Sequence, residues 1–207
     1  MGGPSLIENV AGVLIAGGKS RRMGTDKRFL SVAGKTLFER TMEVLESTFR
    51  DIIIVLAEPV EKLDVRGARV VFDAVPGCGS LGGLYTGLEA SPHRRVFAVA
   101  CDMPFLNQRL IRFLVDYDSS VDVVVAELAT GVHPMHAVYS KQCAPLLRSM
   151  AERQDLKIQR LFLAADLRVR VLRERDLAPL DPGLRSFQNI NTPEDLALAE
   201  SLLPPDS

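Results

Sequence analysis

The sequence predicts an α/β fold because short apolar runs rich in β-branched residues alternate with stretches of helical length. The runs are apolar throughout rather than alternating, which is typical of strands buried on both faces of a sheet. An order of strand, helix, strand, helix favours right-handed crossovers with helices on both faces. We therefore expect a three-layer α/β/α sandwich around a mostly parallel, Rossmann-like sheet.

Five strands and five helices are placed by these patterns. The strands are expected at residues 10–16, 51–56, 69–72, 96–101 and 121–126. The helices are expected near residues 37–47, 81–91, 108–117, 142–152 and 193–202.

Two helix starts carry capping signals, and the pattern changes late in the chain. Thr36 with Glu39 has the form of a capping box, and Thr192 stands before a proline at the first helical position. Beyond about residue 128 the pattern loosens, and short strands are expected at 133–139 and 168–172.

The composition is that of an ordinary globular chain. Its 207 residues suit one domain, and 25 basic against 26 acidic residues leave no broad positive face for nucleic acid or a membrane surface. Three cysteines, Cys78, Cys101 and Cys143, lack the spacing of a disulfide framework or a zinc site. With no signal-like N-terminus and no apolar run of membrane-spanning length, the chain is expected in the cytoplasm.

The first strand runs into a glycine-rich, basic loop. Gly17-Gly18 ends the apolar run. Three of the next four residues are basic, Arg22 among them, and Gly24 and Lys27 follow within ten residues. Bare backbone N–H groups beside fixed cations are what a polyphosphate needs. The loop therefore indicates nucleotide binding, and the alternative is a tight turn at a sheet edge.

The loop is not a P-loop, although Gly18-Lys19-Ser20 has the ending of one. That motif needs a glycine five positions before its second glycine, and this position is Val13. Residues 13–16 also have the pattern of a strand rather than a loop.

Two carboxylates follow other predicted strands. Asp102, held by the nearby Pro104, comes after the strand at 96–101, and Asp73 comes after the strand at 69–72. Ligands of such sheets bind beyond the carboxyl ends of the strands, so Gly17, Asp73 and Asp102 are expected around one crevice. Asp102 can offer a hard oxygen ligand to Mg²⁺, and the alternative role of either aspartate is a turn or helix cap.

A second glycine pattern raises an alternative. Gly77, Gly79 and Gly82 match a dinucleotide-binding fingerprint, with Asp102 at the expected distance. Residues 74–76 separate this pattern from its strand, whereas the fingerprint glycines should follow the strand at once. An NAD-dependent oxidoreductase remains a remote alternative.

The last third of the chain carries further polar candidates. His133 and His136 are three residues apart, which in a strand places them on opposite faces, so a metal pair is not favoured. Contact with substrate or plain packing is expected instead. Asn189 and Asn191 place two amides on one side of an extended segment just before a helix.

These motifs together resemble a known family. Residues 15–27 resemble the opening signature of the MobA-like nucleotidyltransferase superfamily, residues 101–105 its metal-binding aspartate motif, and residues 79–83 its nucleobase loop. His133-Pro134 and the segment 191–196 are similar to the molybdenum cofactor guanylyltransferases within it.

The resemblance implies a nucleotide-diphospho-sugar transferase type of fold, with residues 1–207 as one domain. It implies a nucleotide-binding half at about 10–128 and an acceptor-binding half at about 129–203. The implied reaction moves GMP from GTP to the terminal phosphate of molybdopterin, with Mg²⁺ as cofactor and pyrophosphate released. Transient contact with other molybdenum-cofactor biosynthesis proteins or apo-molybdoenzymes is also implied.

The resemblance and the residues together give a candidate site. Arg22, Lys27 and Asp102 are the catalytic candidates, and Asp102 is also the Mg²⁺ ligand. GTP-binding candidates are Ile15, Ala16, Gly17, Gly18, Lys27, Asp73, Gly79, Leu81, Gly82 and Asp102. Candidates on the pterin side are His133, Asn189 and Asn191.

Three alternatives stay open on the sequence alone. A related nucleotidyltransferase that uses CTP, UTP or another phosphorylated acceptor would share the first loop. A GTP-binding protein without activity and the oxidoreductase above are the other two.

Overall fold

The computed structural model describes residues 5–17, 27–59, 65 and 67–203. Its main sheet has eight strands in the order β10-β7-β9-β6-β1-β4-β5, with β8 paired to β7. The strands are β1 (Val10–Ile15), β4 (Ile52–Leu56), β5 (Arg69–Phe72), β6 (Arg95–Ala100), β7 (Val123–Leu128), β8 (Gly131–Val132), β9 (His136–Ser140) and β10 (Val169–Arg173).

The sheet is mixed. β1 pairs in parallel with β4 and β6, and the pairs β4–β5 and β7–β10 are also parallel. β9 lies between β6 and β7 and runs antiparallel to both, and β8 is antiparallel to β7. The α/β fold with a largely parallel sheet is confirmed, and the antiparallel insertion of β9 is what the sequence pattern did not indicate.

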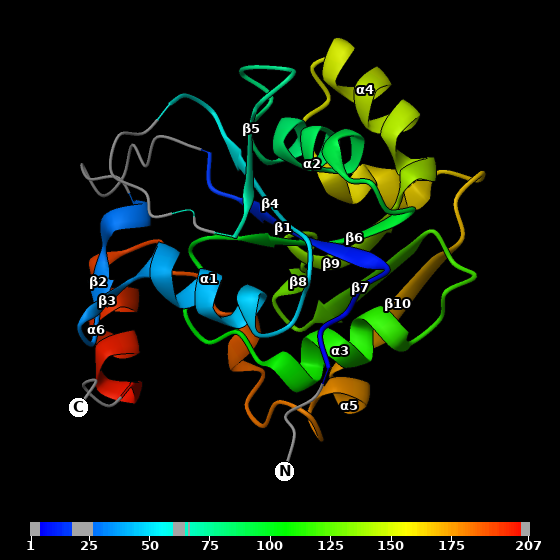
Figure 1. Cartoon of the computed structure of the whole chain (residues 1–207). Coiled ribbons are helices and arrows are strands. Elements are labelled where there is room, and N and C mark those ends of the chain that lie inside the picture. The colour runs from blue at the N-terminus through cyan, green and yellow to red at the C-terminus, as the bar shows by residue number, and fades with distance from the viewer. Residues whose placement is uncertain (1–4, 18–26, 60–64, 66, 204–207) are drawn as a thin grey trace.

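Helices cover both faces of the sheet, which gives the expected three layers (Figure 1). α1 (Leu37–Glu46), α3 (Gln108–Asp116) and α5 (Glu174–Leu177) lie on one face. α2 (Gly79–Ala90) and α4 (Ala144–Glu152) lie on the other. Strand β1 serves both layers, because Leu14 packs toward α1 and α3 whereas Val13 packs toward α2.

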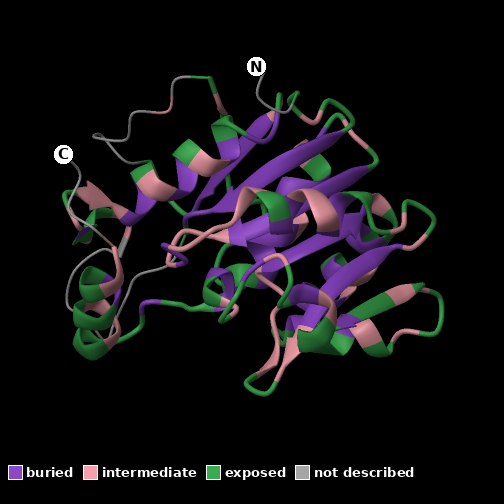
Figure 2. Cartoon of the chain, turned by 90° about the horizontal axis from the view of Figure 1, so that it is seen from below, coloured by how far each residue is buried: buried purple, intermediate pink, exposed green. Residues whose placement is uncertain are grey.

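The five strands predicted from continuous apolar runs are buried on both faces, with one exception, whereas the later strand β10 is largely exposed. Figure 2 shows the central strands buried between helices whose outer sides are exposed. β5 was also expected to be buried on both faces, and this is wrong: Arg69 is exposed and the Phe72 side chain is 52% exposed. β5 is the last strand of the sheet, so it lies where the covering layers end.

A small unit stands beside the sandwich. The two-stranded sheet of β2 (Ser31–Val32) and β3 (Lys35–Thr36) packs with α6 (Pro193–Leu202) through a cluster that includes Val32, Ile190 and Ala199. Neither strand was predicted, because two residues are too short to show a period. The capping box of Thr36 with Glu39 is present, and Thr192 caps α6 by accepting from the Asp195 N–H.

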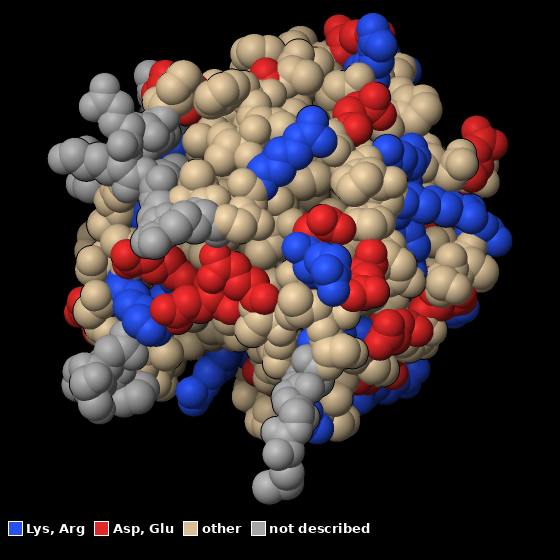
Figure 3. Space-filling model, in the orientation of Figure 1, with Lys and Arg blue, Asp and Glu red and all other residues tan. Residues whose placement is uncertain are grey.

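Charges are interspersed on the surface. On the face drawn in Figure 3, Lys and Arg side chains lie among Asp and Glu side chains rather than forming one basic surface. Among the described residues, no helix combines the length and the apolar character needed to span a bilayer.

Helix α2 lies unusually close to β1. A Cβ atom added at Gly87 would lie 2.4 Å from Val13 Cγ1, and one at Gly83 would lie 2.7 Å from Ile15 Cγ2. The two glycines therefore let the helix backbone approach the strand, which fixes the start of α2 beside the carboxyl edge of the sheet.

We predict that Gly87→Ala destabilises the protein by about 1–2 kcal/mol, because the clash with the fixed Val13 side chain outweighs the better helix propensity of alanine. Urea unfolding measures this change. Glu89→Ala on the exposed side of α2 is the matched control and should be near neutral. A Gly87→Ala protein as stable as the wild type would contradict the close approach.

Candidate functional site

The ends of β1 and β6 form the centre of the candidate site. Ile15 pairs with Ala100 in the parallel register, so Gly17 and Asp102 each lie two residues beyond the last paired position. In the sheet, β4 lies next to β1 on one side of this pair, and the antiparallel β9 lies next to β6 on the other side. Open α/β sheets bind ligands in the crevice at such a change in strand order.

The start of the glycine-rich loop is held by backbone contacts. The Ala16 N–H donates to the Val55 carbonyl at 3.0 Å, and Gly17 is exposed. A Cβ atom at Gly17 would lie 3.2 Å from the Ala57 nitrogen. Because the Ile15 and Ala16 side chains are buried, these residues can offer a ligand only their backbone.

For three predicted residues of the loop the structure gives no side-chain position. Gly18 and Arg22 lie outside the described residues. Lys27 begins a short 3-10 helix over Lys27–Phe29, and its side chain is also outside the described part.

Asp102 is half-buried, and its Oδ1 atom is buried. Its carbonyl oxygen accepts a hydrogen bond from the Ile190 N–H at 2.9 Å. The following Met103 is buried, so the turn is fixed on both sides of the carboxylate. This bond joins the end of β6 to the segment that carries Asn189 and Asn191.

Asp73 holds its own turn, as the cap interpretation expects. Its Oδ1 accepts from the Val75 N–H at 3.1 Å and from the Thr86 hydroxyl at 3.2 Å. The Thr86 oxygen in turn accepts from the Ala74 N–H at 2.9 Å. A Cβ atom at Gly82 would lie 2.9 Å from both Asp73 carboxylate oxygens, so a glycine is needed for this contact.

The segment predicted to contact the nucleobase, residues 79–83, begins α2. Gly79 is its first residue, with a left-handed φ of 57° that favours glycine. Leu81 is fully buried in the core under this helix, so only its backbone faces a ligand. The helix begins two residues before the expected start.

The strand order argues against the dinucleotide fingerprint. That fingerprint needs the glycine turn and the acidic residue on neighbouring strands. Here the glycine turn follows β5 and Asp102 follows β6, and β4 and β1 lie between those strands.

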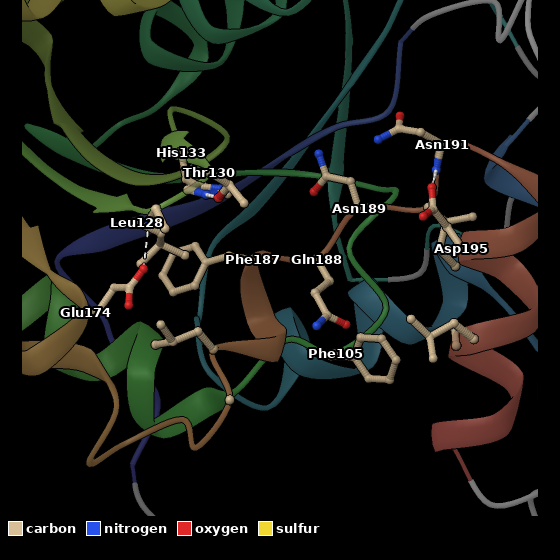
Figure 4. A pocket seen from close by; sticks show the side chains of 16 residues that line it. Phe105, Leu128, Thr130, His133, Glu174, Phe187, Gln188, Asn189, Asn191 and Asp195 are labelled. Carbon is tan, nitrogen blue, oxygen red and sulfur yellow. Dashed lines mark hydrogen bonds between the residues drawn. The ribbon is translucent and has the colours of Figure 1, made fainter.

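A pocket of about 510 Å³ is drawn in Figure 4, and one of its lining residues, Ile190, is the residue whose N–H donates to the Asp102 carbonyl. The pocket brings together His133, Asn189 and Asn191, the three residues expected on the pterin side. Most of the other lining residues were not candidates from the sequence. Thr130, Glu174 and Phe187 gave no signal there, because contacts between distant segments leave no periodic pattern, and Phe105 lies in the predicted motif at 101–105 without having been a candidate itself.

The segment that carries the pocket wall is anchored at several points. The Ser186 hydroxyl donates to the Phe105 carbonyl at 3.0 Å, and Asn107 Nδ2 donates to the Leu180 carbonyl at 3.1 Å. The buried Asp181 accepts from the Ser186 N–H at 2.9 Å. The wall is therefore largely preformed.

His133 and His136 lie on the same side, which corrects the expectation of opposite faces. Both rings pack against Phe187, at centroid distances of 5.1 and 4.6 Å. The reason is that His133 lies in the turn before β9 and not in a strand. Burial lowers the pKa of His133.

His136 is a neutral core residue. Its Nδ1 donates to the Ser186 carbonyl at 3.1 Å, and burial lowers its pKa to about 4. Its Nε2 is buried and has no hydrogen-bond partner in the part of the chain that the structure describes. A second proton there would have no acceptor, which agrees with packing rather than metal binding.

Among the described residues, no group of three or more His, Cys, Asp or Glu side chains could hold a metal ion by itself. Mg²⁺ commonly takes one or two carboxylates together with substrate phosphates.

The model of the MobA-like NTP transferase domain matches residues 12–170. The chain belongs to this family. It is therefore a nucleotidyltransferase by descent, and the residues at the ends of β1 and β6 lie within the matched part.

Individual relatives agree with this family over nearly the whole chain. A molybdenum cofactor guanylyltransferase of Desulfosudis oleivorans is 35% identical over 199 residues, which is 95% of this chain and 97% of that protein. A probable molybdenum cofactor guanylyltransferase of Pelotomaculum thermopropionicum is 34% identical over 91% of this chain and 90% of its own.

The fold is also similar to that of a solved relative. The crystal structure of molybdopterin-guanine dinucleotide biosynthesis protein A from Archaeoglobus fulgidus superposes with a TM-score of 0.82 at 27% identity. The match covers 93% of this chain and 98% of that one. The expected fold class is therefore confirmed by a solved structure.

We predict that His136 makes the protein less stable in acid. The folded-state pKa of about 4 lies below the ordinary 6.5, so the unfolded state takes up the proton first as the pH falls. This contribution is intact above pH 6.5 and is lost toward pH 4, by about 2 kcal/mol between pH 7 and pH 5. Urea unfolding of the wild type and His136→Gln at both pH values measures it.

The variant should show a weaker pH dependence than the wild type by that amount. NMR titration of the wild-type ring tests the same point without a variant, and His136 should stay neutral at pH 5. Titration of this ring near its ordinary pKa would contradict the buried, neutral state.

Proposed function

We propose that the protein transfers GMP from GTP to the terminal phosphate of molybdopterin and releases pyrophosphate. The observation that carries this proposal is the bond between the Ile190 N–H and the Asp102 carbonyl. This bond joins the end of β6, where we expect the nucleotide, to Ile190 in the wall of the pocket, where we expect the acceptor. The names of the relatives supply the two substrates.

The nucleotide would lie along the carboxyl edge of β1. Backbone groups of Ile15, Ala16, Gly17 and Gly18 would contact its phosphates, and the loop containing Gly79, Leu81 and Gly82 would contact the base. Arg22 and Lys27 would neutralise the charge that develops during transfer. Asp73 would act from beneath the base loop, since it already holds that turn.

Asp102 is the proposed ligand of Mg²⁺. Its carboxylate stands at a strand end, and the substrate phosphates would supply further oxygen ligands. When bound, the ion would stabilise negative charge on the phosphates.

The acceptor would occupy the pocket lined by His133, Asn189 and Asn191. Its terminal phosphate oxygen would attack the α-phosphorus of GTP, form the new P–O bond and expel pyrophosphate. The protein supplies no nucleophile, so catalysis rests on positioning and charge stabilisation. In this proposal the nucleotide contacts come mainly from residues 10–128 and the acceptor contacts mainly from residues 129–203, although Phe105 and Leu128 also line the acceptor pocket.

A cytoplasmic location fits this chemistry. None of the three cysteines forms a disulfide bond, which is typical of proteins in a reducing compartment. We also propose brief contacts with the proteins that supply molybdopterin and with those that receive the product, because a reactive cofactor would be passed on while it is bound to protein.

We predict that Asp102→Ala lowers turnover by a hundredfold or more, because charge stabilisation at the reacting phosphate is lost. The bond to Ile190 uses the backbone carbonyl, so the variant should stay folded. Pyrophosphate release from GTP with molybdopterin and Mg²⁺ measures the effect. The exposed Asp166→Ala is the matched control and should keep full activity. An active, Mg²⁺-dependent Asp102→Ala protein would contradict the proposal.

A further inference from the structure

The pocket has two chemically different ends (Figure 4). Asn189 and Asn191 stand at one end, where Ile190 bonds to the Asp102 carbonyl. Glu174 stands at the other end, beside Thr130 and His133. A ligand whose phosphate reaches Asp102 would therefore point its opposite end at Glu174.

The Glu174 carboxylate is held in place. Its Oε1 accepts a hydrogen bond from the Ala129 N–H at 2.7 Å, at the turn between β7 and β8. Figure 4 shows this contact and the second oxygen turned away from it. A carboxylate accepts about four hydrogen bonds, so most of its capacity is left for a ligand.

Neighbouring cations do not neutralise this carboxylate. Arg173 pairs with Glu127, and Arg175 approaches Asp176 at 3.9 Å. Within the described residues, no Lys or Arg side chain lines the pocket. The other acidic lining residue in the described part of the chain is Asp195, at the opposite end beside Asn191 (Figure 4). It differs from Glu174 because its Oδ2 already accepts from two backbone N–H groups, those of Asn191 and Thr192, each at 2.9 Å.

This arrangement of charges determines which part of a ligand can bind at the Glu174 end of the pocket. Glu174 is exposed, and Arg173 and Arg175 line an adjacent hollow with it, but among the described residues no Lys or Arg side chain lines this pocket itself. A phosphate inside the pocket would therefore be repelled by Glu174. A group with several N–H donors would be attracted, and a hydrogen bond to an ionised acceptor is among the stronger ones. The Glu174 end therefore suits the ring of the acceptor and not its phosphate.

We propose that Glu174 recognises the donor edge of a fused 2-amino-4-oxopyrimidine ring, the ring system of a pterin. That edge presents an amino N–H and a ring N–H side by side, which match the lone pairs of one carboxylate. The assignment rests on the proposed function, since that function makes a pterin the acceptor. Guanine has the same edge, so the test must separate the acceptor from GTP.

The test compares two free ring compounds as fluorescent probes. Pterin carries the 2-amino group, and lumazine has an oxo group in its place. The full-length wild type should bind pterin about tenfold more tightly than lumazine, as expected for a hydrogen bond to a charged group. Glu174→Gln keeps an oxygen for the Ala129 N–H and should bind the two probes about equally.

The matched control is Glu194→Gln, on the exposed start of α6 and outside the pocket lining. It should keep the wild-type preference for pterin. GTP affinity, measured separately, should be unchanged in both variants. Unchanged selectivity in Glu174→Gln, no preference or no binding in the wild type, or a loss of GTP affinity in Glu174→Gln would each overturn the assignment.

Failure of this assignment is distinguishable from failure of the proposed function. If the wild type transfers GMP to molybdopterin and Glu174→Gln has the same KM for molybdopterin, only the Glu174 assignment fails. If the wild type transfers nothing, the proposed function fails, whatever the probes show.

Discussion

The parallel pairing of β1 with β6 is the constraint on which the site depends. Its register places Gly17 and Asp102 at matching positions beyond the strand ends, although 84 residues lie between them in the sequence. Neither residue could meet the other without this pairing. The close approach of α2, made possible by Gly83 and Gly87, then brings the segment predicted to contact the nucleobase to the same edge.

The second half of the site depends on a segment with little regular structure. Residues 180–191 are held by bonds to the β6–α3 connection and by the contact of Phe187 with two histidines. A neutral His136 fits this arrangement, since a charged ring in that position would lie buried without an acceptor. The pocket carries Glu174 at one end and Asn189 and Asn191 at the other, where Asp195 accepts hydrogen bonds from backbone N–H groups at the start of α6. In the proposed function, the heterocyclic ring lies at the Glu174 end and the phosphate lies toward Asp102.

Much of this arrangement was predictable, for identifiable reasons. Buried strands such as 10–16 and 96–101 showed as continuous apolar runs, and the caps at Thr36 and Thr192 showed as local patterns. The antiparallel β9 could not be predicted, because strand direction depends on distant pairing rather than on the apolar run itself. Glu174 was missed for the same reason, since its place in the pocket comes from its bond to Ala129, far away in the sequence.

The most direct test of the account follows the GMP moiety itself. The protein is incubated with molybdopterin, Mg²⁺ and GTP labelled at the α-phosphorus, and the products are separated. The account predicts that the label moves into a molybdopterin guanine dinucleotide with one pyrophosphate released per transfer, and that labelled CTP at the same concentration gives little product. Label that stays in GTP, appears only in hydrolysis products, or moves equally well from CTP would contradict it.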